Sequence, residues 1–264
     1  RPCGRRPAAY HVLGGLAVAT AFDAPELASL KRLLVTAHHI LDNEGIFDGY
    51  GHISVRVPGD GAFLTLARVS PRLVREDTLI LLGLDGTYLG GAQPAPFEWP
   101  IHAEILRARP DVQCVAHTHS RWSAVFSVLP VPLRPVHQYA AFLPTMGVPV
   151  YRGAGLVTTP EQGAALAATL GTEAAALLRH HGDVVVGSSV EETVIRTLRL
   201  AWNGQIQHLA PQHGEPDYLG AEECAAFTAA ARDIGRAWSY YLSRLPEGRR
   251  GGHGRDDSVV PSSS

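Results

Sequence analysis

The chain has 264 residues, of which 45% are hydrophobic and 18% charged, and its formal net charge is -2 at pH 7. These proportions are those of an ordinary globular protein, and they exclude collagen-like, coiled-coil and largely disordered chains. The balanced charge provides no basic surface of the kind that attracts nucleic acid or anionic lipid, so we expect neither nucleic acid nor a membrane as partner. Three widely spaced cysteines, Cys3, Cys114 and Cys224, do not suit a disulfide framework, and together with the lack of a long apolar run they favour a cytoplasmic protein.

The first part of the chain predicts a helix followed by two hairpins. Residues 23–45 place apolar side chains at helical spacing, with Asp23 as the expected N-cap and Pro25 in the first turn. Residues 49–71 contain two short strand-like runs around a Pro-Gly-Asp-Gly turn, and residues 77–91 contain two more around Asp-Gly. Each pair is typical of a β-hairpin.

The second part alternates helices with strands. We expect helices at 98–109 and 121–129, a helix at 159–171 capped by Thr159, and two long helices that end the fold at 189–210 and 219–245. Strands are expected at 112–120, 148–153 and 173–189, the last interrupted by a His-Gly pair. This mixture predicts an α/β sandwich, with a sheet covered by helices. We divide the chain into an N-terminal arm (1–23), a single domain (24–245) and a disordered tail (246–264) that is too poor in apolar groups to fold.

Two histidine-rich segments carry the strongest chemical signal. His117 and His119 lie two residues apart in an expected strand, where side chains at i and i+2 point to the same side. Neutral imidazole is the commonest nitrogen ligand for zinc, and a catalytic ion needs three protein ligands with one position left open. A third ligand could come from His180 or His181, which an apolar strand delivers to a glycine-containing turn.

A carboxylate upstream strengthens this interpretation. Glu98 begins a helix, and His102 follows it by one turn on the same face. A glutamate beside a metal can act as a general base. Glu104 is the competing carboxylate, but its helical position places it off this face.

In combination, Glu98-Trp99 with His102, His-Thr-His-Ser at 117–120 and His-His-Gly at 180–182 resemble the class II aldolase/adducin family. The resemblance covers about residues 24–210. It implies an α/β/α sandwich with a central, mainly antiparallel sheet flanked by helices, and a homotetramer whose active site is completed by a neighbouring subunit. It also implies one divalent metal ion per subunit, zinc above all, with Mn, Mg, Co or Fe as alternatives. The implied roles are metal ligands for His117, His119 and His181, and acid/base catalyst for Glu98.

The chain departs from the family's sugar-phosphate aldolases where those enzymes hold phosphate. They use the asparagine of a Gly-Asn pair and two serines just before the glutamate, whereas this chain has His52 after Gly51 and a Pro-Phe pair before Glu98. Residues 66–74 and 133–143 are more similar to the branch that contains decarboxylases of hydroxylated aromatic or ring-opened dicarboxylic acids. Arg68 or Arg56 could hold a carboxylate by a bidentate pair. The expected substrate-binding residues are Gly51, His52, Arg68 and Ser70.

We therefore expect a metal-dependent carbon–carbon lyase, either a decarboxylase or an aldolase, that acts on a non-phosphorylated hydroxy, keto or hydroxy-aromatic acid through a metal-stabilised enolate. Glu98 would handle the proton, and Tyr139 or His137 would protonate the product carbon. Two alternative enzymes are a non-haem iron oxygenase, because three histidines also bind Fe(II), and a sugar-phosphate aldolase or epimerase. A non-catalytic binding module, as in the adducins, predicts missing ligands, and none is missing here.

Overall fold

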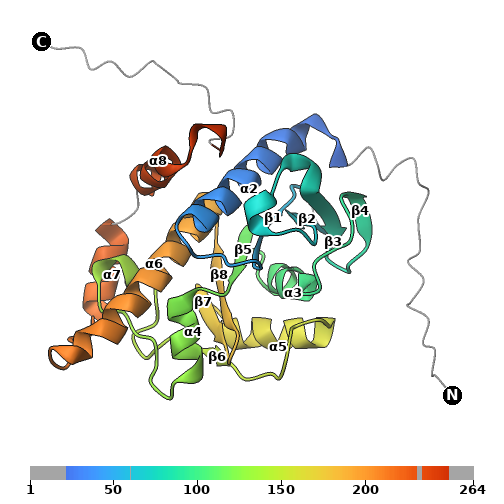
Figure 1. Ribbon diagram of the computed structural model, residues 1–264. Coiled ribbons are helices and arrows are strands. Elements are labelled where there is room, and N and C mark those ends of the chain that lie inside the picture. The colour runs from blue at the N-terminus through green and yellow to red at the C-terminus, as the bar shows by residue number, and fades with distance from the viewer. Residues whose placement is uncertain (1–21, 60, 231–233, 250–264) are drawn as a thin grey trace, which may run out of the picture.

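A central sheet organises the molecule, whose computed structural model describes residues 22–59, 61–230 and 234–249 (Figure 1). The sheet has eight strands in the order β4-β3-β2-β1-β5-β8-β7-β6. All neighbouring pairs are antiparallel except β6 and β7, which are parallel. The strands are β1 (His52–Arg56), β2 (Ala62–Leu66), β3 (Leu79–Gly83), β4 (Tyr88–Gly91), β5 (Cys114–Thr118), β6 (Val150–Tyr151), β7 (Ala175–Leu178) and β8 (Gly182–Gly187).

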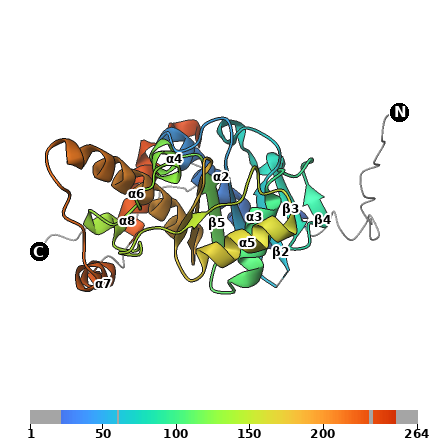
Figure 2. The ribbon, with the colours of Figure 1, turned by 90° about the horizontal axis from the view of Figure 1, so that it is seen from below.

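Helices cover both faces of the sheet, so the expected α/β/α sandwich is confirmed. They are α2 (Pro25–Asn43), α3 (Trp99–Ala108), α4 (Arg121–Val128), α5 (Pro160–Leu170), α6 (Val190–Leu209), α7 (Ala221–Ala230) and α8 (Gly235–Arg244). Helices α3 and α5 lie side by side on one face (Figure 2), and α2, α4 and α6 pack on the other. Within the described ranges, no helix combines the length and apolar character needed to cross a membrane.

The core follows from the alternation of side chains along the strands. In β2, Phe63 joins the cluster under α3 and α5, whereas the next residue, Leu64, joins the cluster under α2 and α6. Successive strand residues point to opposite faces, so a strand covered on both sides is apolar throughout. This burial holds the central strands rigidly, and β1, β5 and β8 are the strands that carry the candidate site.

Most expected elements are confirmed, and three details differ. Asp23 does not cap the first helix: the N-cap is Ala24, without a side-chain cap, and Asp23 forms an ion pair with Lys31 at 3.8 Å. The single helix expected over 219–245 is divided into α7 and α8, and α8 begins at Gly235, a residue type that weakens helix interiors.

The third difference concerns the start of the expected tail. Residues 247–249 form a short 3-10 helix, and the Arg249 guanidinium donates to the Asp42 carboxylate at 2.7 Å. This ion pair fastens the segment to α2. The remainder of the expected tail, residues 250–264, and residues 1–21 of the expected N-terminal arm lie outside the described residues.

His38 joins α2 to the sheet through both ring nitrogens. Its Nε2 accepts the backbone N–H of Ile53 at 3.1 Å, so the ring proton is on Nδ1 and is donated to the Leu34 carbonyl at 2.8 Å. Burial is the main cause that lowers the pKa of His38, to about 4 from 6.5. The neutral ring therefore contributes stability that is present above pH 6.5 and is lost as the pH falls towards 4.

We expect His38→Leu to lower the free energy of unfolding at pH 7 by roughly 1–3 kcal/mol, because the buried Ile53 N–H loses its acceptor. The difference from the wild type should narrow between pH 6.5 and 4. Urea unfolding in the presence of a chelator measures both effects, with exposed His213→Leu as the control. A difference that does not change with pH would contradict a neutral His38 in the native state.

Candidate metal centre

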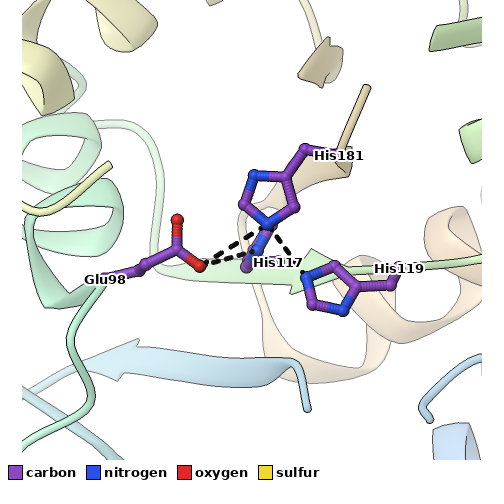
Figure 3. A group of neighbouring side chains, drawn as sticks. All are labelled: Glu98, His117, His119 and His181. Atoms are coloured by element: carbon purple, nitrogen blue, oxygen red, sulfur yellow. Dashed lines mark hydrogen bonds and ion pairs between the residues drawn. The ribbon is translucent and has the colours of Figure 1, made fainter. Parts of the chain in front are cut away.

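Three histidines and a glutamate meet where β5, the β7–β8 turn and the start of α3 come together (Figure 3). His117 lies on β5, and His119 follows just after that strand ends. Pairing of β8 with β5 brings the preceding turn, which contains His181, alongside them. Glu98 is the N-cap residue of α3. Residues up to 83 positions apart in the chain are thus gathered by the order of the strands.

The ligand atoms of these side chains lie at distances that suit a metal ion. All four lie within 4.8 Å of one another. His119 Nε2 is 3.0 Å from His181 Nε2, and Glu98 Oε2 is 3.5 Å from His117 Nε2 and 3.6 Å from His181 Nε2. Ligands about 2.1 Å from a tetrahedral ion are separated by roughly 3.4 Å. The group therefore has the spacing of a compact four-ligand site.

The clearest observation in favour of a cation is an unpaired nitrogen. His117 Nε2 is buried and has no hydrogen-bond partner, one of two such side-chain atoms within the described ranges. Its other nitrogen, Nδ1, lies 2.9 Å from the Asp183 carbonyl, which fixes the proton on Nδ1 and leaves a lone pair on Nε2. A buried acceptor without a partner is costly, so this lone pair, directed at the other ligands, fits a metal ion.

The electrostatic environment leaves most of these groups in the states that bind metals. Burial raises the pKa of Glu98, but His117 and the Val157 N–H, which donates to Oε1 at 2.9 Å, outweigh it and lower the pKa to about 2. Burial lowers the pKa of His181 to about 4, with further lowering by His117. At His117 burial also lowers the pKa, but Glu98 and the Asp183 carbonyl reverse the direction and raise it. A proton and a cation therefore compete at His117.

Outer contacts orient two of the ligand rings. The Asp183 carbonyl fixes His117, and the Asp48 carboxylate lies 3.4 Å from Nδ1 of His119. Such partners of the second ring nitrogen are typical of metal-binding histidines, because they hold the ring orientation and tautomer.

The carboxylate of Asp183 lies behind the site. It is fully buried and accepts the hydroxyls of Thr118, at 2.8 and 3.0 Å, and of Ser123. Burial is the main cause that raises its pKa to about 6. These bonds join β5, β8 and α4 at the point where the histidines project.

His52, expected to bind substrate, lies next to His117. The two residues are directly opposite in the β1–β5 pair, and their ring centroids are 5.3 Å apart. His52 Nδ1 is 2.6 Å from His102 Nε2, and His102 Nδ1 is 2.6 Å from Ser54 Oγ. Gly51 precedes them with φ of 94°, and a Cβ there would lie 3.1 Å from the His117 carbonyl oxygen, so the position suits glycine.

Arg68 lies against the segment that precedes Glu98. Its guanidinium is 3.7 Å from the centroid of the Phe97 ring and donates to the Ala95 carbonyl at 3.2 Å. Ser70 lies at the N-cap of a 3-10 helix (Pro71–Leu73), where its side chain makes no capping hydrogen bond. Arg68 thus contacts the segment that leads into Glu98, and within the described residues no hydrogen bond or ion pair joins Arg68 or Ser70 to the four clustered side chains.

Other candidates lie away from the cluster within one chain. Tyr139 is 46% exposed, and its ring contacts are His137, Trp202 and Arg199. The structure therefore does not bring Tyr139 together with Glu98 in a single subunit. His180, next to His181, is exposed and has φ of 60°. Arg56 donates to the carbonyls of Val112, Leu106 and Arg109, which gives it a structural role.

Sequence reasoning did not find three residues around the site. Asp48 and Ser54 carry no motif of their own, because their partners, His119 and His102, lie far away in the chain. Asp183 did have a signal: it is a carboxylate within the apolar strand Gly182–Gly187, and a buried carboxylate needs partners.

Comparison with known proteins identifies the family. Residues 32–208 match the Class II Aldolase and Adducin N-terminal domain, and the chain belongs to this family. A 3,4-dihydroxyphthalate decarboxylase from Rhodococcus jostii is 29% identical over 188 residues, covering 66% of this chain and 77% of the relative. A 5-methylthioribulose-1-phosphate/5-deoxyribulose-1-phosphate aldolase from Rhodospirillum rubrum is 30% identical over 202 residues, covering 74% and 87%.

A solved structure of an aldolase II superfamily protein from Pseudomonas syringae superposes with a TM-score of 0.74 at 26% identity, covering 88% of this chain and 99% of that one. These relatives place the chain in an enzyme family of carbon–carbon lyases. Several of its curated relatives are decarboxylases, which agrees with the decarboxylase branch indicated by the sequence.

Proposed function

We propose that this chain is a metal-dependent decarboxylase of a non-phosphorylated hydroxy-aromatic or related hydroxy or keto acid. Its ligands would be His117, His119 and His181, with Glu98 beside them as the group that moves the proton. The observation that carries this choice concerns the segment just before Glu98. The Arg68 guanidinium stacks on Phe97 there, and positions 96 and 97 carry no short hydroxyl side chain.

The donors near the cluster suit a carboxylate better than a phosphate. A phosphate dianion needs several converging donors, often backbone N–H groups with small hydroxyl or amide side chains. The residues before Glu98 are Pro96, which has no N–H, and Phe97, which has no side-chain donor. Arg68 and His52 offer a cation and an imidazole instead, and an arginine can bind a carboxylate through two parallel hydrogen bonds.

The residues supply the remaining chemistry of a decarboxylation. A bound divalent cation would act as a Lewis acid and stabilise negative charge that develops on a substrate oxygen. Arg68 and His52 would orient the carboxylate that leaves as carbon dioxide. Glu98, ionised at neutral pH, would take the proton of a substrate hydroxyl and return it to the carbon from which carbon dioxide has departed. The bond between the carbon and the carboxylate breaks, and the proton takes the place of the carboxylate on that carbon. No oxidant is needed.

The decisive experiment compares substrates on the purified protein after loading with zinc, manganese, cobalt or iron. We expect carbon dioxide release from 3,4-dihydroxyphthalate or another hydroxylated aromatic acid, and little cleavage of L-fuculose 1-phosphate or 5-deoxyribulose 1-phosphate. Efficient cleavage of a sugar phosphate would return the chain to the aldolase branch. Oxygen uptake, with activity restored by iron alone, would instead support the oxygenase. Sedimentation of the same sample tests the expected homotetramer, in which Tyr139 of a neighbouring subunit could reach the site.

Arg68→Ala is expected to lower kcat/KM for the acid by roughly 10–100-fold, because a hydrogen bond to a charged group contributes about 1.5–3 kcal/mol. A neutral ester of the same acid should bind almost unchanged as an inhibitor. The control is Arg75→Ala, which removes an exposed arginine paired with Asp77 at 2.8 Å. If the acid and the ester lost affinity equally, Arg68 would act only by holding Phe97 in position and not by binding the carboxylate.

A further inference from the structure

A chain of three side chains runs from the protein interior to the candidate site. Ser54 Oγ lies 2.6 Å from His102 Nδ1, and His102 Nε2 lies 2.6 Å from His52 Nδ1. Ser54 and His102 are fully buried, whereas His52 is half-buried beside His117. The proposed mechanism uses only His52, so the two inner residues have no role in it yet.

The hydroxyl of Ser54 sets the direction of the hydrogen bonds. His102 Nδ1 is the one side-chain partner of this hydroxyl within the described residues, and Ser54 has no exposed surface. If His102 donated to Ser54, the buried hydroxyl proton would have no acceptor, which is costly. Ser54 therefore donates, and His102 Nδ1 is the acceptor. Burial lowers the pKa of His102 and the nearby Val115 carbonyl acts in the raising direction, and Ser54 is the hydrogen-bond partner of His102 Nδ1 within the described residues.

The donor role of Ser54 decides which nitrogen carries the proton in both His102 and His52. A neutral imidazole has one donor and one acceptor nitrogen. A ring that accepts a hydrogen bond at one nitrogen has no proton there, so it is neutral and carries its proton on the other nitrogen. His102 accepts at Nδ1 and must donate from Nε2. His52 then accepts at Nδ1, and its proton is on Nε2.

The outer nitrogen of His52 is partly accessible, and its ring lies beside that of His117. His52 Nε2 has no protein partner among the described residues, and it is not among the enclosed atoms that lack one. It therefore keeps surface of its own, next to His117 in the paired strand. Its N–H is free to donate to a ligand.

We propose that Ser54 and His102 are positioning residues that hold His52 in its Nε2–H tautomer, so that the site offers a fixed N–H donor to a carboxylate or carbonyl oxygen of the substrate. The ligand half of this proposal rests on the proposed function, whereas the tautomer does not. A fixed donor favours an acceptor oxygen over a group that can only donate, because its tautomer is set before the ligand arrives.

Nitrogen NMR of the histidine rings tests the tautomer directly. The spectra are recorded on ¹⁵N-labelled protein without substrate, with and without zinc, and His52 is assigned from the signals missing in His52→Gln. We expect Nε2 of His52 to be protonated and Nδ1 to be bare. Protonation of His52 on Nδ1, or of His102 on Nδ1 towards the Val115 carbonyl, would overturn the proposal. The result does not depend on which substrate is turned over.

Variants of the inner residue test its positioning role. Ser54→Ala should give a mixture of His52 tautomers and lower kcat/KM for the acid by up to about tenfold, and Ser54→Thr should restore both. The matched control is Thr65→Val, because Thr65 lies opposite Ser54 on β2 and its buried hydroxyl donates to the Ile53 carbonyl at 3.0 Å. An unchanged tautomer in folded Ser54→Ala would refute the assigned direction.

Variants of His52 test whether its Nε2–H donates to the substrate. His52→Leu should lower kcat/KM for the acid by roughly 10–100-fold, and His52→Gln should recover most of it, because the glutamine amide can place an N–H near the Nε2 position. Equal losses in the two variants would remove the donor role even if the wild type releases carbon dioxide. Absence of any acid decarboxylation by the wild type would defeat the proposed function and leave the NMR result to decide the tautomer.

Discussion

Glu98→Gln is expected to lower kcat by roughly 10²–10⁴, the usual contribution of a general acid or base. The amide keeps an oxygen that can accept the Val157 N–H, which now donates to Oε1 at 2.9 Å, so the start of α3 should stay in place. What is lost is the carboxylate oxygen that lies 3.5 Å from His117 Nε2 and 3.6 Å from His181 Nε2. Steady-state kinetics with metal content measured on the same sample provides the test.

The metal content separates two roles that the geometry of Glu98 allows. Retained metal with lost turnover supports proton transfer, whereas loss of both would make Glu98 a fourth ligand. The control is Glu104→Gln on the same helix, which removes a carboxylate that is paired with Arg107 and lies outside the cluster. Unchanged turnover in Glu98→Gln would leave it only the task of binding the Val157 N–H.

His181→Asn is expected to weaken zinc binding by on the order of 10²-fold and to lower turnover at limiting zinc. In structural zinc sites four ligands share a binding free energy of about 10–16 kcal/mol, so one ligand contributes roughly 3 kcal/mol, or about two powers of ten in Kd. Competition with a chromogenic chelator measures the Kd without reference to activity.

The adjacent histidine offers a matched control. His180→Asn makes the same substitution one residue earlier, at an exposed side chain outside the cluster, and asparagine tolerates its φ of 60°. We expect its zinc affinity to equal that of the wild type. Equal weakening in the two variants would mean that the turn, and not the His181 imidazole, is what matters for the metal.

Local patterns were enough to predict much of the fold. The helix α5 begins at Pro160 behind Thr159, whose side chain accepts the N–H of Gln162, as its sequence predicts. The hairpins β1–β2 and β3–β4 form around their Gly-containing turns. Caps, turns and periodicity depend on residues a few positions apart, so they can be read from the chain. The break between α7 and α8 has no equally strong local signal, and it was missed.

The residue types of the candidate site were also visible in the sequence, because His-x-His, His-His-Gly and a helix-start glutamate are short motifs. The residue pattern alone left His180 and His181 both open as the third ligand, and only the family resemblance selected His181. In the structure the left-handed backbone at His180 leaves that side chain exposed, and His181 joins the group. The link from Ser54 through His102 to His52 likewise arises only when α3 packs under β1. Contacts between residues about 50 positions apart follow from the strand order and the packing of buried layers, and the tertiary structure alone decides them.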